Sequence, residues 1–201
     1  MTRRVVVFDL GGVLLDWNPR HLYRKLFADE AAMEEFLGQV CTPEWNLKQD
    51  AGRPFAEAVA ELAPRHADKV HLIHAWRDRF GEMIAGPIDD TVDILRELKS
   101  RSVPVYALSN WSAETFPGCA PRFPFLALFD GIVLSGREGC MKPDPRIFRI
   151  LLERYDLRAE ETVFIDDNAA NAQAATALGI HGVHFRSPSQ LRTELASLSL
   201  L

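Results

Sequence analysis

An apolar run that ends in a carboxylate is the feature that most constrains the fold of this chain. The run comprises Val5, Val6, Val7 and Phe8, and Asp9 follows it directly. Four β-branched or aromatic residues are too few for a helix and indicate a strand buried on both faces, as in a parallel sheet. Because a charged group seldom ends a buried strand without a partner, Asp9 is the first candidate site residue.

Two glycines follow this strand at once. Gly11 and Gly12 let the backbone turn sharply and approach a ligand without a Cβ in the way. This arrangement predicts that Asp9 stands at the carboxyl end of a central strand, which is the edge where open α/β sheets bind ligands. Taken alone, the same aspartate could equally cap a turn. The remainder of the chain has to decide between the two interpretations.

Bulk composition excludes several classes of protein. The 201 residues suit one domain with a smaller inserted one, and 47% hydrophobic residues supply a sizeable core. A net charge of −5 and the absence of a basic block predict no nucleic-acid partner. No apolar stretch approaches the roughly 18 residues that a membrane span needs. Three widely spaced cysteines predict no disulfide framework and favour a reducing, cytoplasmic location.

The segment 17–88 is predicted to be helical, because it shows no alternation typical of strands. Asn18-Pro19 and Thr42-Pro43 predict helix starts, and Gly52 and Pro64 predict stops. Roughly seventy residues exceed an ordinary connection between a strand and a helix. We therefore expect an all-α cap domain at 17–88, inserted into a core domain formed by 1–16 and 89–201.

Helix and strand alternate after residue 88. The expected strands are 103–108, 131–134, 162–165 and 182–185, and the expected helices are 90–99, 144–155, 168–178 and a last one after Pro188. Such alternation predicts an α/β fold, with a Rossmann-like doubly wound parallel sheet and right-handed crossovers.

Polar residues follow three of these strands, as Asp9 follows the first. Ser109 and Asn110 come after one strand, Lys142 lies beyond the next, and Asp166-Asp167 follows the third. Since the carboxyl ends of parallel strands share one edge, we expect these side chains to meet. The separate alternatives are a solvated lysine at 142 and a simple helix cap at 166–167.

Together these residues have the chemistry of phosphoryl transfer. Asp9 and Asp167 can hold a hard cation such as Mg²⁺, which prefers carboxylates, water and substrate phosphate. Lys142 and the Ser109 hydroxyl would hold the transferred group. Attack by a carboxylate on phosphorus divides hydrolysis into two easier steps through an aspartyl phosphate.

The sequences D-L-G-G-V, S-N, K-P and D-D-N, in this order, resemble the four signature motifs of the haloacid dehalogenase-like (HAD) hydrolases with a helical (C1) cap. The resemblance covers nearly the whole chain, although the cap is matched only by position and helicity. It implies a catalytic group and a metal group. The catalytic group is Asp9 as the nucleophile, with Ser109 and Lys142. The metal group is Asp9 again, with Asp167, Asp166 and the Gly11 carbonyl.

Gly11 departs from the family pattern. Most phosphatases of the family have an aspartate there as general acid and base, a role worth about 10²- to 10⁴-fold in rate. Among the family, members similar to α-D-glucose-1-phosphate phosphatase share the departure, and so do the 2-haloacid dehalogenases. Asp16 and the cap histidines are the candidate substitutes, and none of them is compelling.

The function we expect is Mg²⁺-dependent hydrolysis of a small phosphorylated metabolite, with sugar phosphates among the candidates. The expected substrate contacts are Ser109, Asn110, Gly12, Trp17 and Trp111, although both tryptophans suit core packing equally well. Two alternatives remain open: a metal-independent 2-haloacid dehalogenase, and a non-catalytic binding protein. The acidic pair at 166–167 favours the phosphatase, because dehalogenases carry a serine-rich segment there. The expected oligomeric state is a monomer or weak homodimer.

Overall fold

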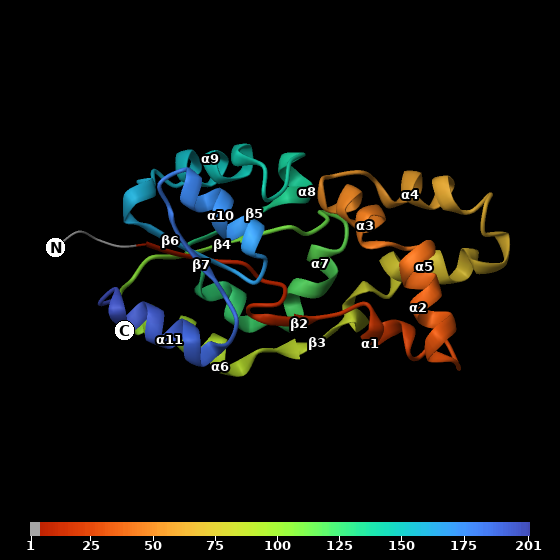
Figure 1. Ribbon diagram of the computed structural model, residues 1–201, viewed down its shortest axis with the longest axis horizontal. Coiled ribbons are helices and arrows are strands. Elements are labelled where there is room, and N and C mark those ends of the chain that lie inside the picture. The colour runs from red at the N-terminus through yellow and green to blue at the C-terminus, as the bar shows by residue number, and fades with distance from the viewer. Residues whose placement is uncertain (1–4) are drawn as a thin grey trace.

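A five-stranded parallel sheet forms the centre of the computed structural model, which describes residues 5–201 (Figure 1). Residues 1–4 of the expected core segment lie outside the described residues. The strand order is β5-β4-β1-β6-β7. The strands are β1 (Val5–Phe8), β4 (Val105–Ser109), β5 (Gly131–Leu134), β6 (Thr162–Asp166) and β7 (His181–His184). The predicted doubly wound α/β fold is confirmed, and its first strand is the middle one.

Side chains of β1 alternate between two hydrophobic layers. Val6 and Phe8 belong to the layer that includes α6 (Asp89–Ser100) and α11 (Pro188–Ser197). The other layer takes Val5 and Val7 with α9 (Pro145–Arg154) and α10 (Ala169–Ala177). Figure 1 shows these two pairs of helices on opposite faces of the sheet. All four β1 residues are buried, which explains why the strand reads as a continuous apolar run.

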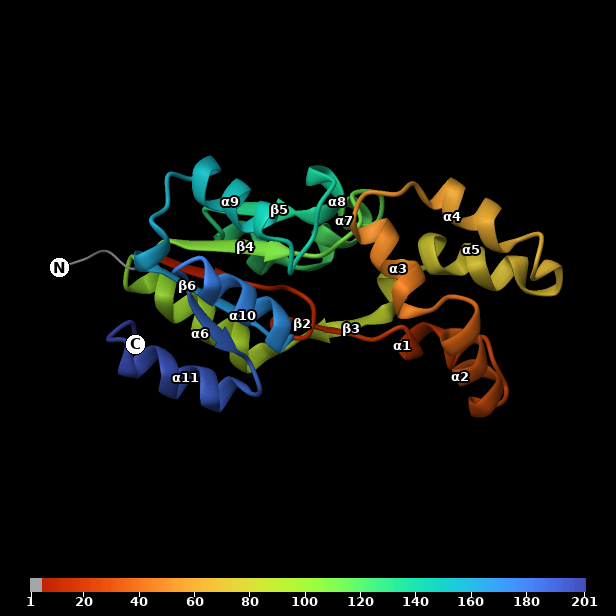
Figure 2. The ribbon, with the colours of Figure 1, turned by 45° about the horizontal axis from the view of Figure 1, so that its top comes forward.

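The cap is built from short helices beyond one end of the sheet, and the strands point their carboxyl ends toward it (Figure 2). Its helices are α1 (Arg20–Tyr23), α2 (Glu30–Gln39), α3 (Pro43–Asp50), α4 (Phe55–Leu62), α5 (Val70–Asp78), η1 (Ala67–Lys69) and η2 (Phe80–Met83). Thr42 caps α3 by accepting the Trp45 N–H at 3.1 Å, as the Thr-Pro pattern predicts.

The expectation that 17–88 contains only helices is wrong at its two ends. β2 (Leu15–Trp17) and β3 (Ile84–Pro87) form a two-stranded antiparallel sheet where the chain enters and leaves the cap. Strands of three and four residues are too short to show alternation, and their pairing partners lie far apart in sequence. Cap and core are not separate hydrophobic units, because one buried cluster runs from the sheet into the cap helices.

The remaining helices are short segments around the sheet edge. They are α7 (Phe116–Cys119), α8 (Ser135–Glu138), η3 (Ala120–Arg122), η4 (Pro124–Leu128) and η5 (Ala159–Glu161). Within the described residues, no helix combines the length and the apolar character that crossing a membrane requires.

Specific contacts hold the cap against these core segments. Ser135 of α8 donates its hydroxyl hydrogen to the backbone carbonyl of Asp50, at the end of α3. Glu114 accepts the Phe55 backbone N–H at 2.9 Å and pairs with Arg77 at 3.1 Å. The cap is therefore docked on the loop that follows β4 and on α8.

Candidate active site

The ends of three neighbouring strands bring the predicted site residues together. Asp9 directly follows β1, Ser109 ends β4 and Asp166 ends β6. Lys142 reaches the same edge from the loop between α8 and α9. Since β4, β1 and β6 are adjacent and parallel, segments far apart in the chain meet at one carboxyl edge.

Lys142 is a buried cation between two of these carboxylates. Its Nζ lies 2.9 Å from Asp9 Oδ1 and 2.7 Å from Asp166 Oδ2, and its side chain is 0% exposed. Asn110 holds the Lys142 backbone with two bonds of 2.9 Å, accepting from its N–H and donating to its carbonyl. The alternative of a solvated lysine is wrong. The side-chain amide of Asn110 is therefore bonded to the loop that carries Lys142.

Asp166 and Asp167 are adjacent but have different surroundings. Asp166 is fully buried and accepts hydrogen bonds from the Asn168 N–H at 2.8 Å and from the Asn171 amide at 3.1 and 3.2 Å, besides Lys142. Asp167 is exposed at the site, so its carboxylate is the more available of the two. The helix-cap alternative is wrong, because Asn168 is the residue that caps α10.

Three carboxylates form a possible metal site. Among the described residues, Asp9, Asp166 and Asp167 are the one group whose ligand atoms lie close enough to hold an ion, all within 4.8 Å of one another. An all-oxygen set suits a hard cation such as Mg²⁺. His71 and His74 are exposed and belong to no such group.

The electrostatics of the site reflect crowded negative charge. Burial raises the pKa of Asp9 to about 7, although the Lys142 ammonium opposes the shift. Burial alone would lower the pKa of Lys142, but Asp9 and Asp166 outweigh it and raise that pKa. Burial and the charge of Asp166 raise the pKa of Asp167. One ammonium among three carboxylates leaves excess negative charge that a dication would offset.

The two glycines after Asp9 differ in what they permit. Gly12 has a φ of +72°, and a Cβ there would lie 2.2 Å from Asp167 Oδ2. A Cβ at Gly11 would meet nothing closer than the Trp17 Cβ at 3.9 Å. Gly12 is therefore required where the backbone turns against the acidic group, whereas Gly11 has space for a side chain.

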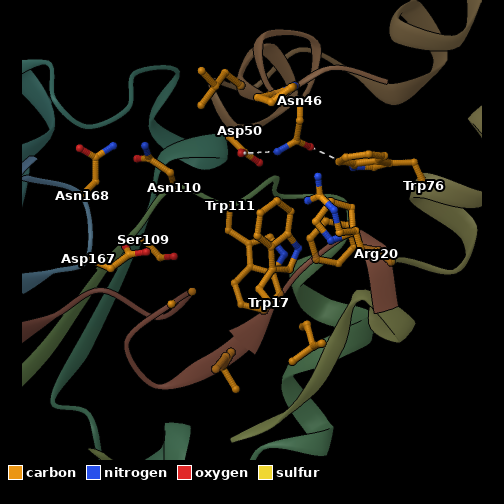
Figure 3. A pocket seen from close by; sticks show the side chains of 18 of the residues that line it. Trp17, Arg20, Asn46, Asp50, Trp76, Ser109, Asn110, Trp111, Asp167 and Asn168 are labelled. Atoms are coloured by element: carbon orange, nitrogen blue, oxygen red, sulfur yellow. Dashed lines mark hydrogen bonds between the residues drawn. The ribbon is translucent and has the colours of Figure 1, made fainter. Parts of the chain in front are cut away.

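A pocket of about 710 Å³ separates the strand ends from the cap (Figure 3). Asp9, Ser109 and Asp167 line its core side. Aromatic and aliphatic residues dominate the rest, namely Trp17, Trp76, Phe80, Trp111, Leu15, Leu37, Leu47 and Ile84.

Trp17 and Trp111 each pack against Phe80 and also line the pocket, so packing and ligand access coexist at both. The Trp111 N–H donates to Thr115 at 3.0 Å. The Trp17 N–H is buried without a hydrogen-bond partner among residues 5–201.

Asp50 and Asn46 are pocket residues that sequence reasoning missed. The Trp76 indole donates to Asn46 at 2.9 Å, and the Asn46 amide donates to Asp50 at 2.8 Å. Burial raises the pKa of Asp50 to about 8, and the negative charge of Asp9 adds to this increase. Hydrogen bonds from the Ser112 N–H and from Asn46 act in the opposite direction and lower the pKa. The available signal was an acid at the last position of a helix, where the macrodipole disfavours it.

The substitutes expected for a general acid do not reach the pocket. Asp16 is 55% exposed and pairs with His21 at 3.2 Å. Neither Asp16 nor any histidine of the described chain lines the pocket.

Comparisons with known proteins agree with this arrangement. A family model described as haloacid dehalogenase-like hydrolase matches residues 3–179. A sesquiterpene phosphatase of Aspergillus oryzae is 30% identical over 98% of this chain and 97% of its own. The (S)-2-haloacid dehalogenase 1 of a Pseudomonas species is 29% identical over 98% of this chain and 94% of its own.

A solved structure shows the same likeness in three dimensions. It is a HAD family enzyme of Bacteroides thetaiotaomicron in a magnesium complex, which is 26% identical. It matches with a TM-score of 0.67 over 90% of this chain and 91% of its own.

The substitution Gly12→Ala is expected to lower the affinity for Mg²⁺ about 10- to 100-fold, because the added methyl displaces the Asp167 carboxylate. Isothermal titration of the purified protein with MgCl₂ measures this. Gly11→Ala is the matched control and should change the affinity much less. Equal losses in both variants would contradict this account of Gly12.

Asp50 should make stability fall as pH rises from about 4 to 8. In this window the native state keeps the Asp50 proton, while the unfolded chain, with a pKa near 3.8, releases it. The unfolded state then binds fewer protons, so the free energy of unfolding declines by up to about 1.4 kcal/mol per pH unit. Urea unfolding of wild type and Asp50→Asn at pH 5, 6, 7 and 8 should show a shallower decline in the variant. Identical slopes would contradict a protonated Asp50.

Proposed function

Because the chain belongs to the haloacid dehalogenase-like hydrolase family, we propose that it is a Mg²⁺-dependent phosphomonoester hydrolase that works through an aspartyl phosphate. The observation that carries the proposal is the meeting of Asp9, Lys142 and the Asp166–Asp167 pair at one sheet edge. Carboxylates crowded around one buried ammonium suit a reaction that handles a phosphate dianion together with a dication.

The residues present fit Mg²⁺. Asp9, Asp167 and the Gly11 carbonyl would hold the ion, with Asp166 beside them, and the missing Cβ at Gly12 leaves room for the Asp167 carboxylate. When bound, Mg²⁺ would neutralise phosphate charge and bring the dianion close to the carboxylates.

Asp9 is held in position to act as the nucleophile. Its Oδ1 accepts from the Leu10 N–H at 2.7 Å and lies 2.9 Å from Lys142 Nζ, so two donors fix the orientation of the carboxylate. One carboxylate oxygen would attack phosphorus as the ester bond to the alcohol breaks, giving an aspartyl phosphate. Lys142 and the Ser109 hydroxyl would hold the transferred oxygens. Attack of water on phosphorus would then release inorganic phosphate and regenerate Asp9.

The pocket favours an apolar alcohol as the leaving group. Beyond the strand ends its lining is mainly aromatic and aliphatic. Of the polar residues there, Arg20 and Glu34 pair with each other through two bonds of 2.5 Å, and Asn46 is bonded to Asp50 and Trp76. A sugar would leave several hydroxyls without partners there, which costs free energy. The likeness to a sesquiterpene phosphatase supports an apolar phosphate ester over the sugar phosphates considered from the sequence.

A metal-independent dehalogenase is the second candidate, because Gly11 and the likeness to a 2-haloacid dehalogenase both point to it. The Asp167 carboxylate argues against this function. A negative group at the site disfavours an anionic haloacid unless a cation offsets the charge. Turnover of 2-chloropropionate that survives EDTA, without phosphatase activity, would favour this candidate.

We also propose that the protein is a cytoplasmic monomer or weak homodimer. Its three cysteines are free and buried, which suits a reducing compartment. Among the described residues Leu47 is the one large hydrophobic side chain that is exposed, so no extended apolar patch requires a stable partner.

Asp9→Asn should reduce phosphate release by more than about 10³-fold, because an amide cannot form the aspartyl phosphate. Phosphate release from ester substrates is measured with Mg²⁺ and with EDTA, and EDTA should also abolish the wild-type activity. Circular dichroism checks that the variant is folded. The exposed Asp16→Asn serves as the control and should keep wild-type activity. A fully active Asp9→Asn protein would refute the mechanism.

The apolar pocket predicts a chain-length dependence of catalysis. For a series of n-alkyl phosphates, kcat/KM should rise about fourfold per added CH₂ until the pocket is filled, since each buried methylene contributes about 0.8 kcal/mol. Glucose 1-phosphate should be a poor substrate by the same assay. A flat series, with the sugar phosphate preferred, would show that the apolar lining does not select the substrate.

A further inference from the structure

We propose that Asp50 of the cap is the general acid and base of the reaction, supplying from α3 the proton transfers that Gly11 cannot perform. This inference rests on the proposed phosphatase function and deepens it. It assigns a catalytic role to a residue outside the four sequence motifs.

Asp50 lines the same pocket as the nucleophile. It is the last residue of α3, and the pocket wall includes Asp50 together with Asp9 and Ser109. The carboxylates of Asp9 and Asp50 are near enough for their charges to interact. Figure 3 shows Asp50 on the cap side of the pocket, with Ser109 and Asp167 on the core side. A leaving oxygen on a phosphorus atom bound at Asp9 would lie between the two sides.

Both cap and core hold Asp50 in place. Asn46, itself fixed by the Trp76 indole, donates to Asp50 Oδ2 at 2.8 Å. The Ser112 backbone N–H, from the loop after β4, also bonds the carboxyl. Ser135 holds the Asp50 backbone carbonyl. The carboxyl is therefore held from both the cap and the core.

The surroundings of Asp50 keep a proton on it at neutral pH. The residue is 7% exposed, and the negative charge of Asp9 acts on it. Burial and the negative charge of Asp9 both raise its pKa. The carboxyl accepts a hydrogen bond from Asn46 at 2.8 Å, and the Ser112 N–H also favours its acceptor role. Its own O–H is then left to donate into the pocket.

The two proton transfers balance. As Asp9 bonds to phosphorus, the P–O bond to the alcohol breaks and the leaving oxygen takes the Asp50 proton, which gives the neutral alcohol and an Asp50 carboxylate. That carboxylate then accepts a proton from the water that attacks the phosphorus of the aspartyl phosphate. The products are inorganic phosphate, the Asp9 carboxylate and a protonated Asp50.

The test compares two leaving groups in wild type and Asp50→Asn. n-Hexyl phosphate releases an alcohol that needs a proton, whereas 4-nitrophenyl phosphate releases a stable phenolate. In the variant, kcat/KM for hexyl phosphate should fall about 10²- to 10⁴-fold, while kcat/KM for 4-nitrophenyl phosphate should fall less than about threefold. A purely structural role would lower both equally.

Pre-steady-state kinetics give a second readout. Without its base, Asp50→Asn should release one equivalent of 4-nitrophenol per active site in a burst and then turn over slowly, as the aspartyl phosphate accumulates. The exposed Asp16→Asn protein is the control and should show wild-type values for both substrates.

A third experiment tests whether an aspartate at position 11 can replace Asp50, because Gly11 has space for a side chain. Adding Gly11→Asp to Asp50→Asn should restore at least about tenfold of the lost activity on hexyl phosphate. Equal losses on both substrates in Asp50→Asn, or wild-type rates on both, would overturn the assignment. A folded wild type that hydrolyses neither ester would instead refute the proposed phosphatase function.

Discussion

The structure depends on one buried ammonium, that of Lys142, held between Asp9 and Asp166. Removing such a group from water is costly, and the cost is offset only when partners are placed with good geometry. That requirement brings the end of β1, the end of β6 and the loop before α9 to one point. Asn110 extends the constraint to β4 by holding the Lys142 backbone. Taking away one partner would leave a charge buried without compensation, at about 3 to 5 kcal/mol.

The pocket beside this group of charged residues has two chemically different sides. At the strand ends, carboxylates outnumber the single ammonium, so this half suits a cation and a phosphate together. Toward the cap, aromatic and aliphatic side chains form most of the lining and suit an apolar group. Asp50 and Asn46 are two polar residues on the cap side. The Trp76 indole N–H donates to Asn46, and Asn46 donates to Asp50. The cap thus contributes both an apolar surface and a positioned carboxyl.

Local sequence rules predicted the features that depend on neighbouring residues. The run before Asp9 specified a buried central strand, the Thr42-Pro43 pair began a helix where expected, and the meeting of Asp9 with Lys142 followed from parallel strand order. The rules failed for β2 and β3. These short strands pair with each other, although the whole cap segment separates them in sequence. They placed Asn110 at the site as an expected substrate contact, but they did not predict that its amide bonds the Lys142 backbone.

By itself the sequence determined the α/β fold, the family and the acidic edge of the sheet, because each depends on periodicity or on short motifs at strand ends. Only the tertiary structure decided the apolar character of the pocket and the place of Asp50 in it. Those properties come from side chains of cap helices whose orientation is fixed by docking against the core, through contacts such as that of Ser135 with the end of α3. Burial raises the pKa of a carboxyl, and burial is a property of the assembled interface that no local pattern encodes.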